Sequence, residues 1–133
     1  MKNRSLVLSL LSVLSLSGCS SGPQLGTDVL YACTLLTNPD EYRIFVLMDI
    51  GSGKGDPYDY IDKAVRKFKY PGVIDTLEAT DIKERFAQAL ETFAAAYLKD
   101  IPEIRLQASS NLDEVSNQLR ARCTSLGHKF VEN

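Results

Sequence analysis

Apolar residues recur every three or four positions along most of this chain, which is the spacing of helices that bury one face. The spacing predicts helices at residues 27–37, 57–68, 80–100 and 110–126. The apolar positions that carry them are Val29, Cys33 and Leu36; Tyr58, Ile61, Val65 and Phe68; Ile82, Phe86, Ala89, Leu90, Phe93 and Tyr97; and Leu112, Val115, Leu119, Cys123 and Leu126. We therefore expect an all-α fold, a small bundle of about four to five helices.

Residues that favour helix starts precede several of these elements. Thr27 can cap the first helix, with Asp28 favourable at its positive end, and Asp56 with Pro57 can cap the third. Thr80 and the residue after it open what we expect to be the longest helix, running to about residue 100. Asp59 with Lys63 and Asp62 with Arg66 are four residues apart, which predicts ion pairs on the exposed face of the third helix.

The last predicted helix is bounded by two signals of its own. Ser110 followed by Asp113 resembles a capping box with aspartate in the glutamate position, so we expect the helix to begin there. Pro102 is expected to stop the preceding helix, and Gly127 to follow the end of the last one.

Residues 39–50 allow two interpretations. Asn38 and Pro39 form a strong helix start, whereas residues 44–48 are apolar throughout and rich enough in branched side chains to form a strand. The start signal favours a helix, and the choice between helix and strand for residues 44–50 stays open from the sequence.

Residues 51–57 form a glycine-rich segment that is expected to be exposed. The phosphate-binding pattern fails because position 48 is Met and position 55 is Gly, and the acidic residues do not alternate as in a calcium loop. The segment is either a plain connector or a binding loop. If it binds a protein partner, the contact residues are expected to be Ser52, Lys54 and Asp56.

The N-terminus has the features of a bacterial secretory signal. Lys2 and Arg4 precede an apolar run at residues 6–16, which is too short to span a membrane. The stretch Leu16-Ser17-Gly18-Cys19 then resembles the lipobox of bacterial lipoproteins, which implies cleavage after residue 18 and acylation of Cys19. The alternative is an ordinary signal peptide with an incidental cysteine.

The lipobox divides the chain into a signal peptide at residues 1–18, a lipidated tether at 19–26 and one helical domain at 27–133. It implies a location in the cell envelope, anchored to a membrane and facing the periplasm. Because residue 20 is serine and not aspartate, the lipoprotein pattern implies the outer membrane if the source is Gram-negative.

The charge balance bears on the kind of partner. Residues 1–18 hold two of the 15 basic residues and none of the 17 acidic ones, so the remaining chain carries 13 against 17, a net charge of −4. This balance argues against nucleic acid as a partner, because that binding depends on Lys and Arg neutralising phosphates.

The cysteine count predicts a disulfide. If Cys19 carries lipid, Cys33 and Cys123 remain, and an exported chain meets an oxidising compartment where such cysteines usually pair. Both lie on the apolar faces of their helices, at opposite ends of the domain. Two buried free thiols are the alternative.

The sequence contains few residues of the kinds that usually act as catalytic groups. His128 is the single histidine and follows the last predicted helix, while two of the three cysteines are expected to pair. We therefore expect no catalytic residues, no metal site and no cofactor, and we expect binding rather than enzymatic activity.

Several short stretches resemble a known family, the small helical periplasmic immunity proteins that neutralise type VI secretion amidases (Rap/Tai type). They are residues 97–103 (YLKDIPE), Ala108 with Ser109, residues 119–123 (LRARC), residues 70–73 (YPGV), and Ala32 with Cys33. The resemblance covers about residues 30–123. It implies an all-α fold, inhibition of a secreted peptidoglycan amidase by binding it, and often a homodimer.

The chain departs from that family's pattern at several positions. Ile101 replaces a histidine, Arg122 replaces the proline before the last cysteine, and Tyr70 replaces the middle cysteine. The glycine-tyrosine signature of the second helix is missing. The matched positions are scaffold, so no inhibitory residue carries over. The alternative function is an accessory or structural lipoprotein supporting an outer-membrane or cell-wall complex.

Overall fold

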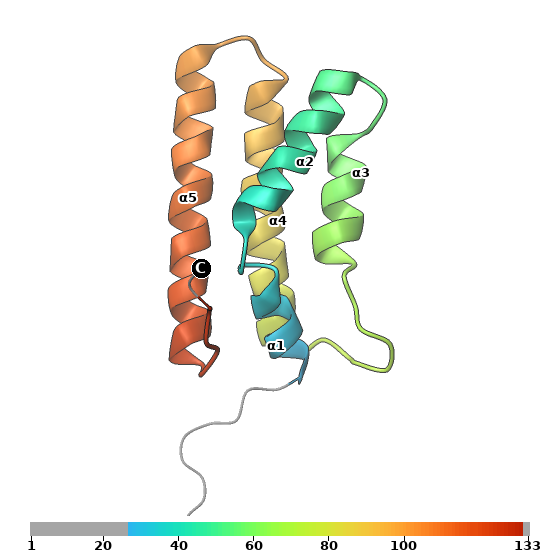
Figure 1. Ribbon diagram of the computed structural model, residues 1–133, viewed down its shortest axis with the longest axis vertical. Coiled ribbons are helices and arrows are strands. Elements are labelled where there is room, and N and C mark those ends of the chain that lie inside the picture. Colours follow the sequence, from blue (N-terminus) through green and yellow to red (C-terminus); the bar gives the residue numbers. More distant parts are fainter. Residues whose placement is uncertain (1–26, 132–133) are drawn as a thin grey trace, which may run out of the picture.

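The computed structural model describes residues 27–131, which form five α-helices and one π-helical turn, with no strand in that range (Figure 1). The elements are α1 (Thr27–Thr34), α2 (Pro39–Ser52), α3 (Pro57–Ile61), the π-turn η2 (Asp62–Arg66), α4 (Leu77–Tyr97) and α5 (Pro102–Ser125). The expected all-α bundle is therefore confirmed.

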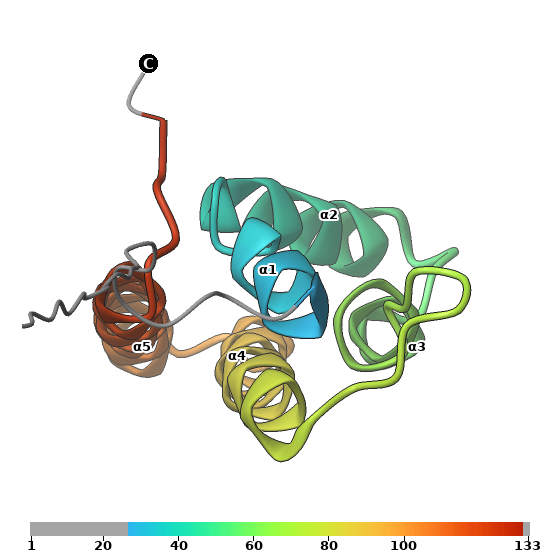
Figure 2. The same ribbon diagram turned by 90° about the horizontal axis from the view of Figure 1, so that it is seen from below.

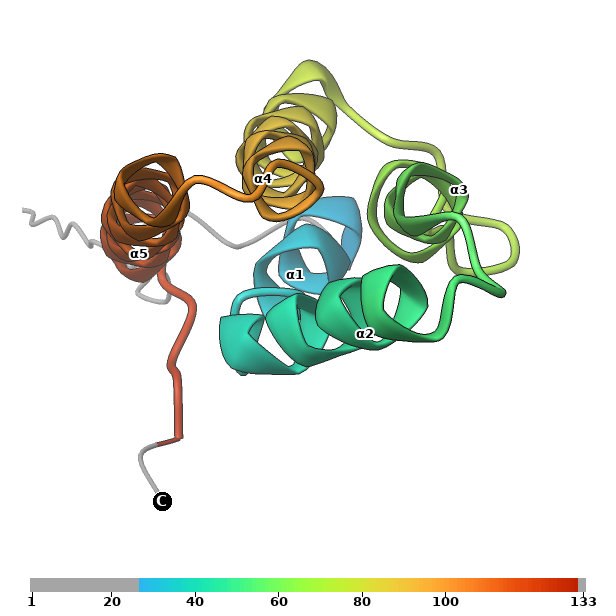
Figure 3. The ribbon, with the colours of Figure 1, turned by 90° about the horizontal axis from the view of Figure 1, so that it is seen from above.

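Helix α4 lies at the centre of the arrangement and contacts every other element. Figure 2 and Figure 3 show α3 on one flank of α4 and α5 on the other, with α1 packed between α4 and α2. The predicted apolar stripe of α4 faces inward: Ile82, Phe86, Leu90 and Phe93 are fully buried. These side chains make the core to which the shorter helices attach.

Residues 44–50 are helical, which decides between the two interpretations of the second element. Asn38 precedes α2 and Pro39 is its first residue, although the Asn38 side chain makes no capping hydrogen bond. Gly53 ends the helix with a left-handed backbone (φ 64°), the conformation that glycine adopts most easily. Residues 51 and 52 therefore belong to α2, and the connecting loop is shorter than predicted, residues 53–56.

The predicted boundaries of the two long helices are wrong. Helix α4 begins at Leu77, because Thr76 and not Thr80 caps it: the Thr76 hydroxyl accepts the backbone N–H of Ala79 at 3.3 Å. Helix α5 begins at Pro102, eight residues before Ser110, and with 24 residues it is longer than α4 with 21.

Proline explains why the start of α5 differs from the prediction. At the first position of a helix its missing N–H costs no hydrogen bond, so Pro102 begins α5 rather than merely ending α4. The first turns of α5 bury only Ala108, so they lack the apolar repeat by which a helix is recognised in a sequence. The end of α5 agrees with the prediction, since Gly127 has φ 103°.

The π-turn after α3 changes the register of the third element. Lys67 donates its backbone N–H to the carbonyl of Asp62, five residues back, at 2.8 Å. The predicted pair of Asp59 with Lys63 forms at 2.8 Å, but Asp62 pairs with Lys67 and not with Arg66. Arg66 turns toward α4 instead. Tyr58, expected on the buried face, is 38% exposed.

Candidate functional site

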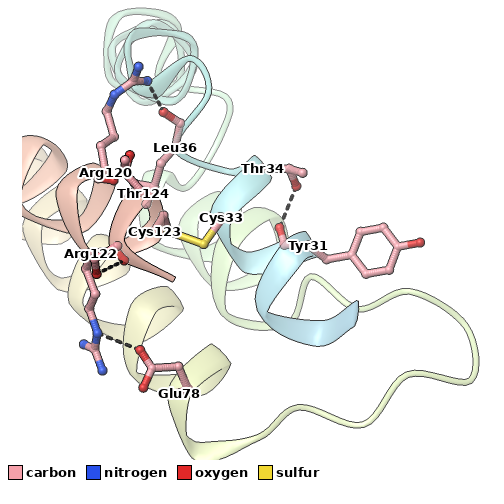
Figure 4. The surroundings of a disulfide bond; sticks show 10 residues. Tyr31, Cys33, Thr34, Leu36, Glu78, Arg120, Arg122, Cys123 and Thr124 are labelled. Carbon is pink, nitrogen blue, oxygen red and sulfur yellow. Dashed lines mark hydrogen bonds and ion pairs between the residues drawn. A yellow bond between two sulfur atoms is a disulfide. The ribbon is translucent and has the colours of Figure 1, made fainter. Parts of the chain in front are cut away.

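A disulfide joins α1 to the last turns of α5. Cys33 and Cys123 are both fully buried, and their Cα atoms are 5.9 Å apart, within the usual range for a disulfide (Figure 4). The bond links positions 90 residues apart, confirming the predicted pairing. It ties the segment that follows the proposed tether directly to the far end of the chain.

Two arginines of α5 surround the disulfide (Figure 4). Arg120 donates hydrogen bonds to the carbonyls of Leu36 and Thr37, which follow α1, and its guanidinium lies 4.2 Å from the centre of the Phe130 ring. Arg122 pairs with Glu78 in the first turn of α4 at 2.6 Å. Together with the disulfide, these contacts hold α1, α4 and α5 in one arrangement.

The single histidine has a structural role at the end of α5. His128 donates its backbone N–H to the carbonyl of Cys123 at 2.9 Å, and Gly127 donates to Thr124 at 3.0 Å, the pair of bonds that defines a Schellman motif. The His128 ring packs against Phe130. Burial, followed by the positive charge of Arg120, lowers the pKa of the imidazole, which favours its neutral form.

The predicted binding residues Ser52, Lys54 and Asp56 lie at the turn between α2 and α3 and are exposed. Asp56 caps α3 by accepting the backbone N–H of Tyr58 at 2.9 Å. The Ser52 hydroxyl accepts the backbone N–H of Lys54 at 3.3 Å. Two of the three side chains therefore also have local structural roles, which matters for any mutational test of this loop.

Part of the outer surface of α2 is apolar, and the search for binding residues in the sequence missed it. Ile44, Phe45 and Met48 are 55%, 44% and 58% exposed, and we call these three residues the α2 face. Positions 44, 48 and 52 are successive i, i+4 neighbours, so this face leads directly to the loop after Ser52. The signal was present in the sequence, because residues 44–48 are apolar without interruption and cannot all be buried by one helix.

The environment next to the α2 face is also apolar. Tyr60 of α3 packs against Phe45 with ring centres 5.5 Å apart. Burial, with smaller contributions from Tyr42, Glu41 and Asp49, raises the pKa of Tyr60 to about 12. The phenol therefore stays neutral at physiological pH, and Tyr60 extends the aromatic part of the α2 face onto α3.

A separate, concave surface lies between α4 and α5. Its volume is about 380 Å³, and it is lined by Thr92, Ala95, Ala96, Lys99, Ile104, Gln107, Ala108 and Asn111. Small side chains from both helices leave this shallow groove. It contains no histidine, cysteine or carboxylate, so its lining offers contact rather than acid–base chemistry.

Comparisons of the chain with family models, curated proteins and solved structures find no match. The surfaces must therefore be judged on their own geometry.

Cys19, the rest of the lipobox and the tether lie outside the described residues. Within residues 27–131, no helix is both long and apolar enough to cross a membrane. In the same range, no three histidine, cysteine or acidic side chains are grouped so that they could hold a metal ion. Residues 27–131 thus form a disulfide-linked bundle that exposes apolar side chains on α2, a surface suited to contact with another macromolecule.

Proposed function

We propose that this protein is a lipid-anchored envelope protein that binds a protein partner through the α2 face and the adjoining loop. The α2 face carries the proposal: three large apolar side chains of one helix, Ile44, Phe45 and Met48, are about half exposed. Single exposed apolar residues are ordinary, but neighbouring ones on a helix are typical of surfaces that pack against a partner.

The attachment of α2 to the rest of the bundle supports this proposal. Val46 is its one fully buried residue, and Arg43 anchors its first turns by pairing with Asp113 of α5 and lying 5.5 Å from the Phe93 ring centre. A face on an anchored helix loses little conformational entropy when it binds, which favours affinity.

We further propose that the partner is a secreted peptidoglycan amidase and that this protein is its immunity protein. The support is the resemblance of residues 97–103 and 119–123 to the Rap/Tai immunity proteins, together with the lipobox-like stretch at residues 16–19, which implies an anchor facing the periplasm, where such an enzyme would act. An inhibitor of this kind would cover the enzyme with a surface and contribute no catalytic group.

Co-expression in the periplasm tests the proposal. A candidate amidase encoded beside this gene is expressed with the wild-type protein, with Met48→Asp or with Lys54→Glu, and lysis is followed as loss of optical density. Wild-type protein should prevent lysis, and Met48→Asp should reduce protection because a charge on the α2 face must be desolvated on binding. Asp56 is left unchanged because its replacement would also remove the cap of α3.

Leu106→Asp is the matched control, since Leu106 is 74% exposed on α5, away from the α2 face. It should protect as well as the wild type. Equal lysis with and without wild-type protein would refute the immunity role and favour the accessory lipoprotein. Loss of protection by Leu106→Asp but not Met48→Asp would place the contact on the α5 side of the molecule instead.

A further inference from the structure

The end of the bundle at which α1 begins exposes large apolar side chains. Ile74 and Leu77, in the segment before α4 and in its first turn, are 88% and 91% exposed, more than any other large apolar residue in the described range. Tyr70 in the same segment is 51% exposed and stacks on Tyr31 of α1 with ring centres 4.1 Å apart. We call Tyr31, Tyr70, Ile74 and Leu77 the tether-end face.

This face is fixed beside the point where the chain enters the domain. The carboxylate of Asp28, in the first turn of α1, accepts the backbone N–H of Thr76 at 2.7 Å. Thr76 lies between Ile74 and Leu77, so the two most exposed apolar residues are held next to the start of α1. Figure 1 shows the beginning of α1 and the loop before α4 at the same, lower end of the molecule.

The length of the tether limits what can lie opposite this face. Seven residues separate Cys19 from Thr27, and the eight residue-to-residue steps, at about 3.3 Å each, reach about 26 Å at most. If Cys19 is acylated, the tether-end face is therefore held within that distance of the bilayer. The other end of α4 lies about 30 Å from the tether-end face, at about 1.5 Å per residue over 21 residues.

The composition of the face fits the interfacial region of a membrane. Tyrosine rings and aliphatic side chains are favourable at the level of the lipid headgroups. Lys69, which is exposed, lies beside Ile74 on the rim of a hollow of about 310 Å³, where its ammonium group can approach a lipid phosphate.

We propose that the tether-end face rests on the lipid bilayer, with Ile74 and Leu77 inserted at the headgroup level, so that the domain stands on the membrane in one orientation. The proposal rests on the lipid anchor of the proposed function. In this orientation the turn between α2 and α3, which lies at the opposite end in Figure 1, points away from the membrane and toward a soluble partner.

Tryptophan scanning can test this orientation without background, because the chain contains no tryptophan. The mature chain from Cys19 is coupled through that thiol to a maleimide lipid in vesicles of phosphatidylethanolamine and phosphatidylglycerol, with Cys33 and Cys123 kept in their disulfide. Variants Ile74→Trp and Leu77→Trp are compared with Leu106→Trp, which places the ring at a 74% exposed position on α5 near the other end.

The readouts are the emission maximum and its quenching by brominated lipids. On coupling, Trp emission at positions 74 and 77 should shift to shorter wavelength and be quenched, whereas emission at position 106 should change in neither respect. Circular dichroism of each variant checks that it is folded, and these exposed positions should tolerate the larger ring.

Two results would overturn the proposal: no quenching at any position, or equal quenching at 74, 77 and 106. Chemical coupling makes this result independent of acylation in cells. Metabolic labelling of the wild type and Cys19→Ala with palmitate tests the anchor separately, so a failure of the anchor can be distinguished from a failure of the orientation.

Discussion

Single charged side chains connect the helices of this bundle at their ends. Arg105 of α5 donates hydrogen bonds to the carbonyls of Tyr97 and Lys99 at 2.9 and 3.0 Å, just where α4 ends. Because carbonyls at a helix C-terminus lack partners within the helix, Arg105 stabilises an end that backbone bonding leaves open. Arg66, the last residue of η2, pairs instead with the carboxylates of Glu91 and Glu84 in the middle of α4, and these contacts raise the pKa of its guanidinium.

Asp28 is another charged side chain that joins two parts of the bundle, and it makes the free energy of unfolding depend on pH. Hydrogen bonds from the hydroxyl and then the backbone N–H of Thr76 lower the pKa of its carboxyl below the ordinary value of 3.8. The folded pKa lies below the unfolded one, so the stabilisation is complete above about pH 4 and is lost as the pH falls through the folded pKa.

We therefore expect Asp28→Asn to lower the free energy of unfolding by about 1 kcal/mol at pH 7, and by less as the pH falls below 3.8. Urea unfolding at pH 7 and pH 3 measures this difference. Asp100→Asn, at a carboxylate that is 99% exposed and lies 3.6 Å from Arg105, is the control and should change stability much less than Asp28→Asn at pH 7. A difference for Asp28→Asn that stays constant with pH would contradict the assigned role.

The burial of an ion pair should decide how much it contributes to the free energy of unfolding. Lys83 is buried and contacts both the carboxylate of Asp75 at 2.7 Å and the carbonyl of Phe68 at 2.8 Å, holding the segment before α4 in place. Asp75→Ala should cost about 3 kcal/mol in chemical denaturation, because it leaves the buried ammonium group with one neutral acceptor. Lys63→Ala breaks the exposed pair with Asp59 and should cost far less, because water and salt screen this pair. Equal costs would be inconsistent with this interpretation.

At the scale of the elements, local signals predicted some boundaries and missed others. Proline at the first helical position marked the starts of α2 and α3, and the Asp56 side chain also caps α3, because both effects act within a few residues. The start of α5 was missed because its first turns are largely exposed. The register of η2 could not be predicted, since Arg66 contacts Glu84, a partner that only the folded chain brings near.

The candidate surfaces also divide into those that local sequence signals predict and those that depend on packing in the folded chain. The loop with Ser52, Lys54 and Asp56 was predicted to be exposed from its glycines, and it is. The α2 face could not be separated from a buried strand by composition alone, because its exposure depends on how α2 packs against α4. The tether-end face depends on the Asp28–Thr76 hydrogen bond, which joins positions 48 residues apart.

Two glycines at the end of α2 should respond in opposite ways to the same substitution. Gly51 is helical with open space at its Cβ position, so Gly51→Ala should stabilise the protein by about 0.5 kcal/mol. Gly53 has φ 64°, which strains any residue with a Cβ atom, so Gly53→Ala should destabilise it by about 1 kcal/mol. Thermal unfolding of both variants checks this, and a shift of the same sign for both would contradict the helix end at Gly53.

At the scale of the whole molecule, the disulfide closes nearly the entire described chain into one loop. Only six residues of that range precede Cys33, and only eight follow Cys123. Cross-linking such a distant pair removes much of the conformational freedom of the unfolded chain, whereas the core around Phe86 and Phe93 stabilises the folded one. The two contributions respond differently to reducing agents, so they can be separated by experiment.

Replacing the cysteine pair should therefore lower stability in a redox-dependent way. With Cys19→Ala as the common background, Cys33→Ala with Cys123→Ala should lower the free energy of unfolding by about 4 kcal/mol under oxidising conditions. Under reducing conditions the parent loses the same constraint, so the difference between the two proteins should fall to the small cost of replacing two buried thiols by methyl groups. Urea unfolding with and without dithiothreitol measures both values. An equal loss in the two conditions would mean that the cysteines stabilise the bundle by packing, because only a covalent bond between α1 and α5 can be removed by reduction.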